Sequence, residues 1–316
     1  MTAFNDTDTG MACPALLNAD ETALQLPYAA LAREIERLLH DDAVQVPTRL
    51  VQPLPGGGCL FVMAALDAHI AITKLITFTP TNAGTGRATI QGDVLVFDIG
   101  TGQRRLIMDG PTVTARRTAA VSLLAAQSLA PKRSGPLLIV GAGAQGRSHL
   151  EAFVQGLGVR EVLIASRSDA SAHALADHAK SLGVDAHVVT DPNAAMSYCP
   201  LVVTCTPANA VVLHANPRPD AFIAAVGAFT PKMVELSADL CQHVAQHGTV
   251  VVDTGDAIHE AGDLIQAGLN VGQFATLREV VCNSIKVPKG PVLFKSCGWA
   301  GWDLAAARTS ARSVEN

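Results

Sequence analysis

The chain has 316 residues, of which 49% are hydrophobic and 16% charged, and its net charge at pH 7 is −5. This composition excludes a disordered chain, and the length is typical of two domains. The acidic balance and an aromatic content of only 4% argue against nucleic acid as a partner.

The N-terminal residues lack the basic and apolar regions of a signal peptide, and no apolar run is long enough to cross a membrane. The seven cysteines never form a CxxC pair, which favours reduced thiols over a disulfide framework or a cysteine-based zinc site. His243 and His247 are four residues apart, but no neighbouring acid completes a ligand set. We therefore expect a cytoplasmic protein that needs neither a membrane nor a metal.

The first part of the chain predicts one helix followed by strands. Residues up to about 20 are expected to be a polar, mobile end. Pro27 then opens a helix, whose apolar stripe contains Leu31, Ile35, Leu38 and Leu39. Strands are predicted over residues 44–50, 60–65, 70–78, 92–99 and 104–108, with a hairpin turn at 101–103. A second helix is predicted from about Thr112.

From Gly135 onward, short apolar runs alternate with helical stretches, which indicates βαβ units and a parallel sheet. Residues 294–311 are expected to form a helix that returns to the first domain. The fold class is therefore α/β, with a Rossmann-type doubly wound sheet beside an α+β domain. The predicted boundaries are 1–115, plus a C-terminal helix at about 300–316, for the α+β domain and 116–299 for the Rossmann-type domain.

A glycine motif marks a candidate dinucleotide site. Gly141, Gly143 and Gly146 form GxGxxG, which follows the apolar run 137–140 and opens a helix, as a dinucleotide fingerprint requires. The glycines permit a tight turn, a close approach of the pyrophosphate and close packing of helix on strand. Free N–H groups at the helix N-terminus then face the phosphates. The alternative is a glycine-rich turn without a ligand.

The residues after the next strand indicate which nicotinamide cofactor is used. NAD enzymes carry an acid there for the ribose 2′-OH, whereas this chain has Ser166 and Arg167. A carboxylate repels a 2′-phosphate, but a hydroxyl and a guanidinium bind one. The sequence therefore predicts NADPH, with NADH possible. The alternative is that Arg167 is a solvated loop residue.

Lys74 is the first candidate for substrate binding. In strand 70–78, alternation places Lys74 on the same face as Ile70, Ile72 and Ile76, and this face should be buried. A buried lysine needs an anionic partner or a ligand. A structural ion pair, or an edge-strand lysine that prevents aggregation, is an equally good interpretation.

Two arginines follow in the predicted helix, after Thr112 and Thr114 as candidate caps. Arg117 shares an apolar stripe with Val121 and should point inward, whereas Arg116 can be solvated. A cation near a helix N-terminus opposes the dipole, so an anion is expected nearby. That anion is either a ligand or the partner in an ion pair within the fold.

These pieces together resemble the ornithine cyclodeaminase/mu-crystallin family. The matching segments are residues 47–49, 63–78, 108–120, 141–146, 202–207, 224–236 and 294–308. The resemblance implies a Rossmann domain that holds a nicotinamide cofactor. It also implies that the other domain binds a small substrate and forms the interface of a homodimer.

The resemblance also assigns site residues. It places substrate-carboxylate binding on Arg49, Lys74 and Arg117, and Lys74 is also the candidate catalytic residue. We expect Lys74 to contact the carboxylate or the imine rather than to form a Schiff base. Besides the glycine loop, cofactor contacts are implied at Thr89, Ala144, Gln145, Ser166, Arg167, Thr206, Val226 and Ser296.

The family includes ornithine and lysine cyclodeaminases, cyclic ketimine reductases, alanine dehydrogenases and opine-like enzymes. Two acids of the cyclodeaminases correspond to Phe61 and Phe229 here. A phenyl ring cannot act as a general base, but it suits the CH₂ groups of a ring. The favoured activity is NAD(P)H-dependent reduction of cyclic ketimines, in which Δ1-pyrroline-2-carboxylate gives L-proline and Δ1-piperideine-2-carboxylate gives L-pipecolate.

Three other activities remain open at this point. The first is an ornithine cyclodeaminase that uses NAD and releases ammonia. The second is an enzyme that resembles alanine dehydrogenase. The third is an NADPH-binding protein without turnover, like the lens crystallin of the family. The intact Arg49, Lys74 and Arg117 argue against the third, because a scaffold has no need of a carboxylate site.

Overall fold

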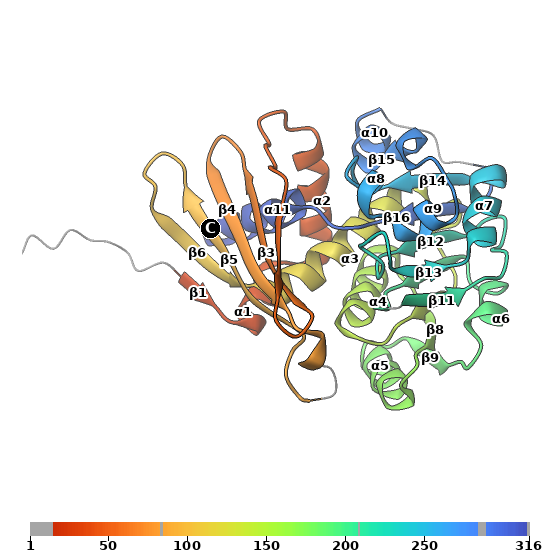
Figure 1. Ribbon diagram of the computed structural model, residues 1–316. Coiled ribbons are helices and arrows are strands. Elements are labelled where there is room, and N and C mark those ends of the chain that lie inside the picture. Colours follow the sequence, from red (N-terminus) through yellow and green to blue (C-terminus); the bar gives the residue numbers. More distant parts are fainter. Residues whose placement is uncertain (1–14, 83–84, 208, 284–288, 315–316) are drawn as a thin grey trace, which may run out of the picture.

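The structure is a computed structural model, and it describes residues 15–82, 85–207, 209–283 and 289–314. Figure 1 shows two sheets side by side, each with its own helices, and the helix α3 (Gly110–Leu129) between them. The C-terminal helix α11 (Ala300–Val314) lies against the first sheet. The chain therefore returns at its end to the part that it builds first. None of the described helices is long and apolar enough to span a membrane.

The first sheet has six strands in the order β1-β6-β5-β4-β3-β2. Neighbours from β2 to β6 run antiparallel, and β1 pairs in parallel with β6. Alternate residues of β4 are buried, because one face of the sheet packs against α11 and side chains alternate along a strand. The strands are β1 (Ala15–Leu17), β2 (Leu50–Leu54), β3 (Gly58–Leu66), β4 (Ile70–Phe78), β5 (Ile90–Asp98) and β6 (Arg104–Asp109). They are accompanied by α1 (Ala19–Gln25), α2 (Tyr28–Leu39) and the short helix η1 (Pro80–Asn82).

Most of the elements predicted for this part are confirmed. The helix after Pro27 is α2, and its predicted stripe is buried. The predicted hairpin turn contains Gly102, which has a φ of +71° and donates a backbone hydrogen bond to Asp98 O. The β4 strand has the predicted bounds, and Lys74 lies on its buried face.

Two predictions for the first part are wrong. Residues 15–20 are not a polar end, because β1 pairs with β6 and Asn18 caps α1 through a capping box with Glu21; the residues before 15 lie outside the described chain. The predicted strand 44–50 is not formed as one element: Gln45 makes an isolated bridge with Leu66, and Leu50 is the first residue of β2. Pro47 explains the second error, since proline cannot donate to a ladder.

The helix α3 begins earlier than predicted. Its N-cap is Asp109, whose carboxylate accepts from the backbone N–H of Thr112, because a carboxylate is a better cap than the threonines that follow. Arg117 consequently lies two turns into the helix. The helix packs against α2 on one side and against α4 (Ala144–Leu157) on the other. The predicted boundary at 115/116 therefore falls inside one continuous helix.

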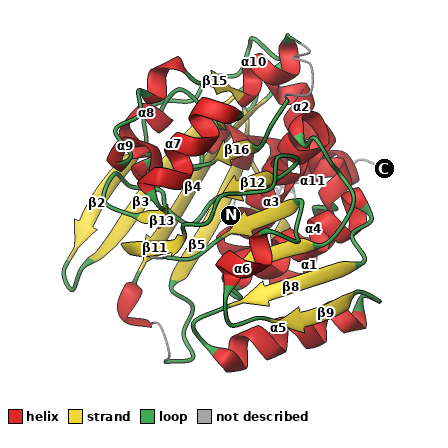
Figure 2. Ribbon diagram, turned by 90° about the vertical axis from the view of Figure 1, so that its right-hand side faces the viewer, coloured by secondary structure: helices red, strands yellow, loops and turns green. Residues whose placement is uncertain are grey.

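The second sheet has eight parallel strands in the order β15-β14-β16-β12-β10-β7-β8-β9. The order reverses between β7 and β10, and ligands of such sheets bind at the carboxyl ends beside this reversal. Figure 2 shows α6 and α7 on the outer side of this sheet. The strands are β7 (Leu137–Val140), β8 (Glu161–Ala165), β9 (Asp185–Val188), β10 (Leu201–Thr204), β12 (Phe222–Ala225), β14 (Thr249–Val252), β15 (Ala275–Thr276) and β16 (Val292–Lys295). The helices are α4, α5 (Asp169–Ser181), α6 (Pro192–Met196), α7 (Ala238–His247), α8 (Ala257–Glu260), α9 (Gly262–Gln266), η2 (Val271–Gln273) and α10 (Leu277–Cys282).

The predicted doubly wound parallel sheet is confirmed, with two differences. Phe294 and Lys295 belong to the central strand β16 rather than to a helix, and α11 begins only at Ala300. Their apolar run is short enough for a buried strand, and Gly298 with a φ of +91° separates it from the helix. The small parallel pair of β11 (Asn209–Leu213) and β13 (Val234–Leu236) is not predicted by the sequence.

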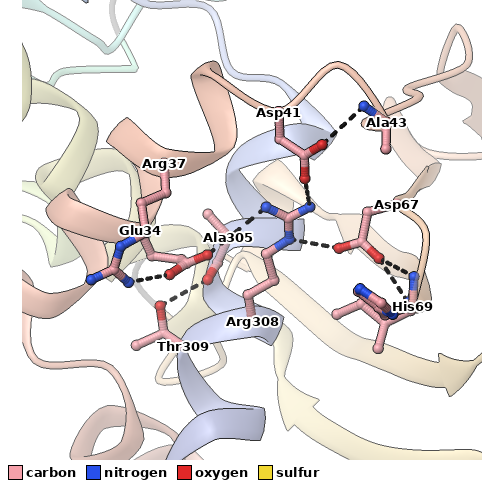
Figure 3. Close-up of polar contacts among 10 residues, drawn as sticks. Glu34, Arg37, Asp41, Ala43, Asp67, His69, Ala305, Arg308 and Thr309 are labelled. Carbon is pink, nitrogen blue, oxygen red and sulfur yellow. Dashed lines mark hydrogen bonds and ion pairs between the residues drawn. The ribbon is translucent and has the colours of Figure 1, made fainter.

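The guanidinium of Arg308 connects α11 to residues beside the first sheet (Figure 3). Arg308 Nε donates to Asp67 Oδ2 and Arg308 Nη2 donates to Asp41 Oδ2, both at 2.6 Å. Asp67 Oδ1 also accepts from the backbone N–H groups of His69 and Ile70. Arg308 Nη1 lies 3.9 Å from the buried Glu34 Oε1. Arg308 therefore joins the last helix to the end of α2 and to the β3–β4 turn.

We predict that Arg308→Ala lowers the free energy of unfolding by about 2–4 kcal/mol at pH 7, because it leaves buried carboxylates without their cation. Urea unfolding measures this change. The matched control is Arg278→Ala, whose guanidinium pairs with the exposed Asp42 at the surface and which should cost less than about 1 kcal/mol.

The same loss should depend on pH. Hydrogen bonds from Ala43 and Arg308 lower the pKa of Asp41, and although burial alone raises the pKa of Asp67, hydrogen bonds from Ile70, His69 and Arg308 lower it on balance. Carboxylates with lowered pKa stabilise the fold fully above their unfolded pKa of about 3.9 and lose this contribution as the pH falls further. The difference between wild type and Arg308→Ala should thus shrink below pH 4; a difference that stays constant down to pH 3 contradicts the assignment.

Candidate active site

The glycine loop lies at the carboxyl end of β7, where the strand order reverses. Gly141 has a φ of +115°, and a Cβ there would lie 2.8 Å from Cys205 O. A Cβ on Gly146 would collide with Gly141 O, whereas around Gly143 there is open space. Gly143 is the N-cap of α4, which begins at Ala144. Two glycines are thus required by packing, and the third leaves room for a phosphate beside free N–H groups.

The end of β8 lies beside this loop, because the backbone N–H of Gly141 donates to Ala165 O at 2.9 Å. Ser166 and Arg167 follow directly. Arg167 is exposed, and no other described residue forms an ion pair with it. The guanidinium is therefore available to an anion next to the glycine loop.

A buried carboxylate that the sequence analysis missed holds the loops after β10 and β12. Glu235 Oε1 accepts from the backbone N–H and the hydroxyl of Thr206, at 2.7 and 2.9 Å. Glu235 Oε2 accepts from the N–H groups of Gly227 and Ala228, at 2.7 and 3.2 Å. Two predicted cofactor contacts, Thr206 and Val226, lie on these loops. Glu235 therefore fixes them relative to each other.

A buried ion pair between Lys295 and Asp263 contacts the same region. Lys295 Nζ lies 2.8 Å from Asp263 Oδ2 and donates to Ala228 O. Asp263 Oδ1 accepts from the backbone N–H groups of Glu235 and Leu236. Burial alone would lower the pKa of Lys295, but the Asp263 carboxylate raises it above its ordinary value. The lysine therefore stays charged inside the domain.

The turn after β16 is fixed by a third carboxylate. Asp253 Oδ2, at the end of β14, accepts from the Ser296 hydroxyl and from the N–H groups of Cys297 and Gly298, at 2.8–2.9 Å. A Cβ on Gly298 would lie 3.3 Å from both Nη atoms of Arg117. The guanidinium of Arg117 thus packs against this turn. Ser296, a predicted cofactor contact, and Arg117, a predicted substrate contact, are brought close together.

Asp303 of α11 joins two of the predicted substrate cations. Asp303 Oδ1 lies 3.1 Å from Lys74 Nζ of β4 and 3.2 Å from Arg117 Nε of α3. The side chains are 0%, 1% and 7% exposed, respectively. Burial lowers the pKa of Lys74 to about 8, against the opposing effect of Asp303. Lys74 and Arg117 therefore take part in ion pairs within the fold, which was one of the two interpretations of their sequence. Because both cations share the single carboxylate of Asp303, one positive charge remains uncompensated.

Arg49, the third predicted substrate cation, forms an ion pair with Glu260 at the end of α8. Each side chain is 20% exposed. The positive charge of Arg49 contributes to the lowered pKa of Lys74, so the three cations share one region. Burial raises the pKa of Glu260 to about 7, and the carboxylates of Asp253 and Asp256 act in the same direction.

Four predicted positions need separate comment. Arg116 is not solvated, because its Nε donates to Leu26 O and its guanidinium stacks 3.9 Å above the Tyr28 ring centroid. Thr89 lies in the loop between β4 and β5, and no described contact joins it to the second sheet. Phe61 and Phe229 are half-buried.

Two further observations concern metal ligands and the surroundings of this site. The described part of the chain contains no group of His, Cys, Asp and Glu side chains that could hold a metal ion. A cavity of about 370 Å³ lies between the end of α2 and the end of β14, and it contains neither Arg49, Lys74 nor Arg117. Asp253, Asp256 and Arg278 contribute the charged side chains of its lining.

Comparison with known proteins gives a consistent result. The family model described as "Ornithine cyclodeaminase/mu-crystallin family" matches residues 15–315. The chain is 37% identical over 312 residues to Delta(1)-pyrroline-2-carboxylate reductase 1 of Burkholderia multivorans, covering 96% of both chains. It is 35% identical over 300 residues to the Delta(1)-pyrroline-2-carboxylate/Delta(1)-piperideine-2-carboxylate reductase of Azospirillum brasilense, covering 93% of this chain and 94% of that one.

A solved structure shares the fold. The Delta(1)-pyrroline-2-carboxylate reductase of Thermococcus litoralis, in complex with NADH and L-proline, superposes with a TM-score of 0.83 at 24% identity. The match covers 95% of this chain and 94% of that one. The Rossmann-type sheet and the accompanying α+β part are therefore a known arrangement.

The structure predicts a large cost for removing the Asp303 charge. Asp303→Asn should lower the free energy of unfolding by about 3–5 kcal/mol, because Lys74 and Arg117 then remain buried without a counter-charge. Urea unfolding measures the change. Asp177→Asn is the matched control, since Asp177 pairs with Lys180 at the surface and should contribute less than about 0.5 kcal/mol. Equal losses in the two variants would contradict the role of Asp303.

Proposed function

The chain belongs to the ornithine cyclodeaminase/mu-crystallin family, and we propose that it is an NAD(P)H-dependent reductase of cyclic ketimines. It reduces Δ1-pyrroline-2-carboxylate to L-proline and Δ1-piperideine-2-carboxylate to L-pipecolate. The observation that carries this proposal is the group of three cations, Arg49, Lys74 and Arg117, in a chain that also has a glycine loop built for a dinucleotide. Gln145, which lies between the last two glycines of that loop at the start of α4, donates to Thr114 O of α3, the helix that carries Arg117. The named activities of the Burkholderia and Azospirillum relatives support it.

Side chains of this chain orient the substrate, match its negative charge and exclude water from the reacting carbon. Arg49, Lys74 and Arg117 bind the substrate carboxylate, and this fixes the adjacent C=N carbon. The glycine loop and the loops held by Glu235 hold the cofactor, and the bound nicotinamide supplies the hydride. Phe61 and Phe229 cover the ring and exclude water from the reacting carbon. The positive charge that remains around Asp303 matches one carboxylate.

Ornithine cyclodeaminase is the rival function. It must handle a second, cationic amino group, for which acids are suited. The positions of two such acids in the cyclodeaminases are Phe61 and Phe229 here. The described site therefore favours a ring with apolar CH₂ groups over a diamine.

The proposal includes a homodimer in the cytoplasm. The outer face of the first sheet exposes large apolar side chains, with Leu16 70%, Leu50 57% and Leu75 42% exposed. Leu60, Leu75 and Leu95 line a shallow hollow on this face. A second copy of the sheet would cover these side chains. The free thiols of the described cysteines suit a reducing compartment; Cys13 lies outside the described residues.

The activity is tested by following NADPH absorbance with each cyclic ketimine and by measuring ammonia from ornithine separately. We expect NADPH oxidation with the ketimines and no ammonia. Arg117→Ala is the control for a reaction at this site, and it should lower kcat/KM by about 10²–10³-fold through the loss of a charge-assisted pair. Ammonia release without NADPH consumption would establish the cyclodeaminase instead, and NADPH binding without oxidation of any ketimine would establish a binding protein.

The cofactor preference is expected to depend on Arg167. Arg167→Ala should raise the KM for NADPH by about tenfold, because a charged hydrogen bond to the 2′-phosphate is lost, and leave the KM for NADH unchanged. Steady-state kinetics with both cofactors measure the ratio. Arg160→Ala is the control, because Arg160 is also exposed but precedes β8 at its other end. An unchanged preference in Arg167→Ala would exclude a phosphate contact.

A further inference from the structure

We propose that Glu260 is the catalytic acid of the reduction, which delivers a proton to the imine nitrogen after the substrate carboxylate has displaced it from Arg49. The inference rests on the proposed function, and it identifies the proton donor that this function requires. The Arg49–Glu260 ion pair joins α8 of the second domain to the segment before β2 of the first. Glu260 is therefore a group of the cofactor domain that reaches a predicted substrate ligand.

The position of Glu260 follows from its partner. The Glu260 carboxylate is held by the guanidinium N–H groups of Arg49, and a substrate carboxylate that replaces it uses the same N–H groups. In a cyclic 2-ketimine the nitrogen is bonded to the carbon that carries the carboxylate. A substrate anchored on Arg49 thus presents its nitrogen next to the guanidinium, where the displaced Glu260 side chain remains within reach. The pair is 20% exposed on each side, so it can exchange partners more readily than the buried contacts of Asp303.

The charges around Glu260 favour its protonated form once the substrate carboxylate has bound to Arg49. The charged and titratable groups that act on Glu260 are Arg49, Asp253 and Asp256, and the Cys297 thiol also lies within its electrostatic range. Arg49 is the cation among them, and it opposes the effects of burial and of the two aspartates. With Arg49 present the pKa of Glu260 is about 7. When the substrate carboxylate neutralises Arg49, the pKa of Glu260 rises further and the group takes up a proton.

The reaction then balances. The C=N π bond breaks, the carbon receives a hydride from the reduced nicotinamide, and the nitrogen receives the proton of the Glu260 carboxyl group. The imine is reduced by two electrons, the cofactor is oxidised by two, and Glu260 is left as a carboxylate. Product release frees Arg49, so the starting ion pair forms again. One proton enters from solvent in each cycle, with the next substrate.

Lys74 is the other candidate donor. It is 1% exposed and bound to Asp303, and its positive charge is needed to hold the substrate carboxylate. Donation from Lys74 would leave that carboxylate beside an uncharged amine and the Asp303 anion. Glu260 is less buried, and when it gives its proton to the imine nitrogen the resulting carboxylate can pair with Arg49 again after product release.

The first test compares wild type with Glu260→Gln over pH 6–9, with the ketimine and NADPH. The loss in kcat should be small at pH 6, where the substrate nitrogen is already protonated, and should grow to about 10²-fold or more at pH 8–9. Asp177→Asn is the control, because Asp177 is an exposed carboxylate on α5 that pairs with Lys180 and does not act on Glu260, and it should follow the wild-type profile. NADPH binding, followed by fluorescence, should be equal in all three proteins.

The second test measures proton uptake without turnover. Pyrrole-2-carboxylate is a planar ring whose nitrogen is not basic, and it is added with NADP⁺ at pH 8 in weak buffer containing an indicator dye. Wild type and Asp177→Asn should take up close to one proton per site, and Glu260→Gln should take up none.

The outcomes separate the inference from the function on which it rests. A loss in Glu260→Gln that is the same at every pH, or proton uptake that persists in this variant, would overturn the role of Glu260. Tighter substrate binding in Glu260→Gln with an unchanged kcat would likewise overturn it, and would make Glu260 only a competitor for Arg49. If the wild type fails to reduce either ketimine, the proposed function itself fails.

Discussion

The rest of the site depends on a carboxylate that is completely shielded from water. Asp303 faces Lys74 and Arg117, and the three side chains come from α11, β4 and α3. A buried charge without a partner costs several kcal/mol, so the last helix of the chain must return to this place for the two cations to stay buried and charged. The same contact sets the charge of the site, because one anion against two cations leaves room for one further anion.

Other buried carboxylates act on the backbone rather than on cations. Glu235 accepts from the loops after β10 and β12, and Asp253 accepts from the turn after β16. Backbone N–H groups at the carboxyl ends of parallel strands have no ladder partner, and a buried donor without an acceptor is costly. These acids therefore determine the shape of the edge where a dinucleotide would lie. Lys295 forms its ion pair with Asp263, whose carboxylate accepts from the backbone of Glu235.

What the sequence predicts well depends on local patterns. The alternation of β4 identifies the buried face of Lys74, and the glycine spacing identifies the loop after β7, because each signal lies within a few residues. The partner of Lys74 could not be found in this way, since Asp303 follows it by 229 positions. Glu235 was missed for the same reason. Residues 44–50 resembled a strand in composition, but Pro47 prevents its pairing.

The two halves of the site differ in how firmly they are held, and this difference suits the proposed exchange of partners at Arg49. Lys74 and Arg117 are fixed on Asp303 in a buried region, where exchanging partners would leave a buried charge unpaired. Arg49 and Glu260 are partly exposed, so their attraction is screened by water and easier to replace. In the proposed mechanism, an incoming carboxylate competes with Glu260 for Arg49, while Lys74 and Arg117 keep their geometry. Because Arg49 belongs to the first domain and Glu260 to the second, this exchange takes place where both parts meet.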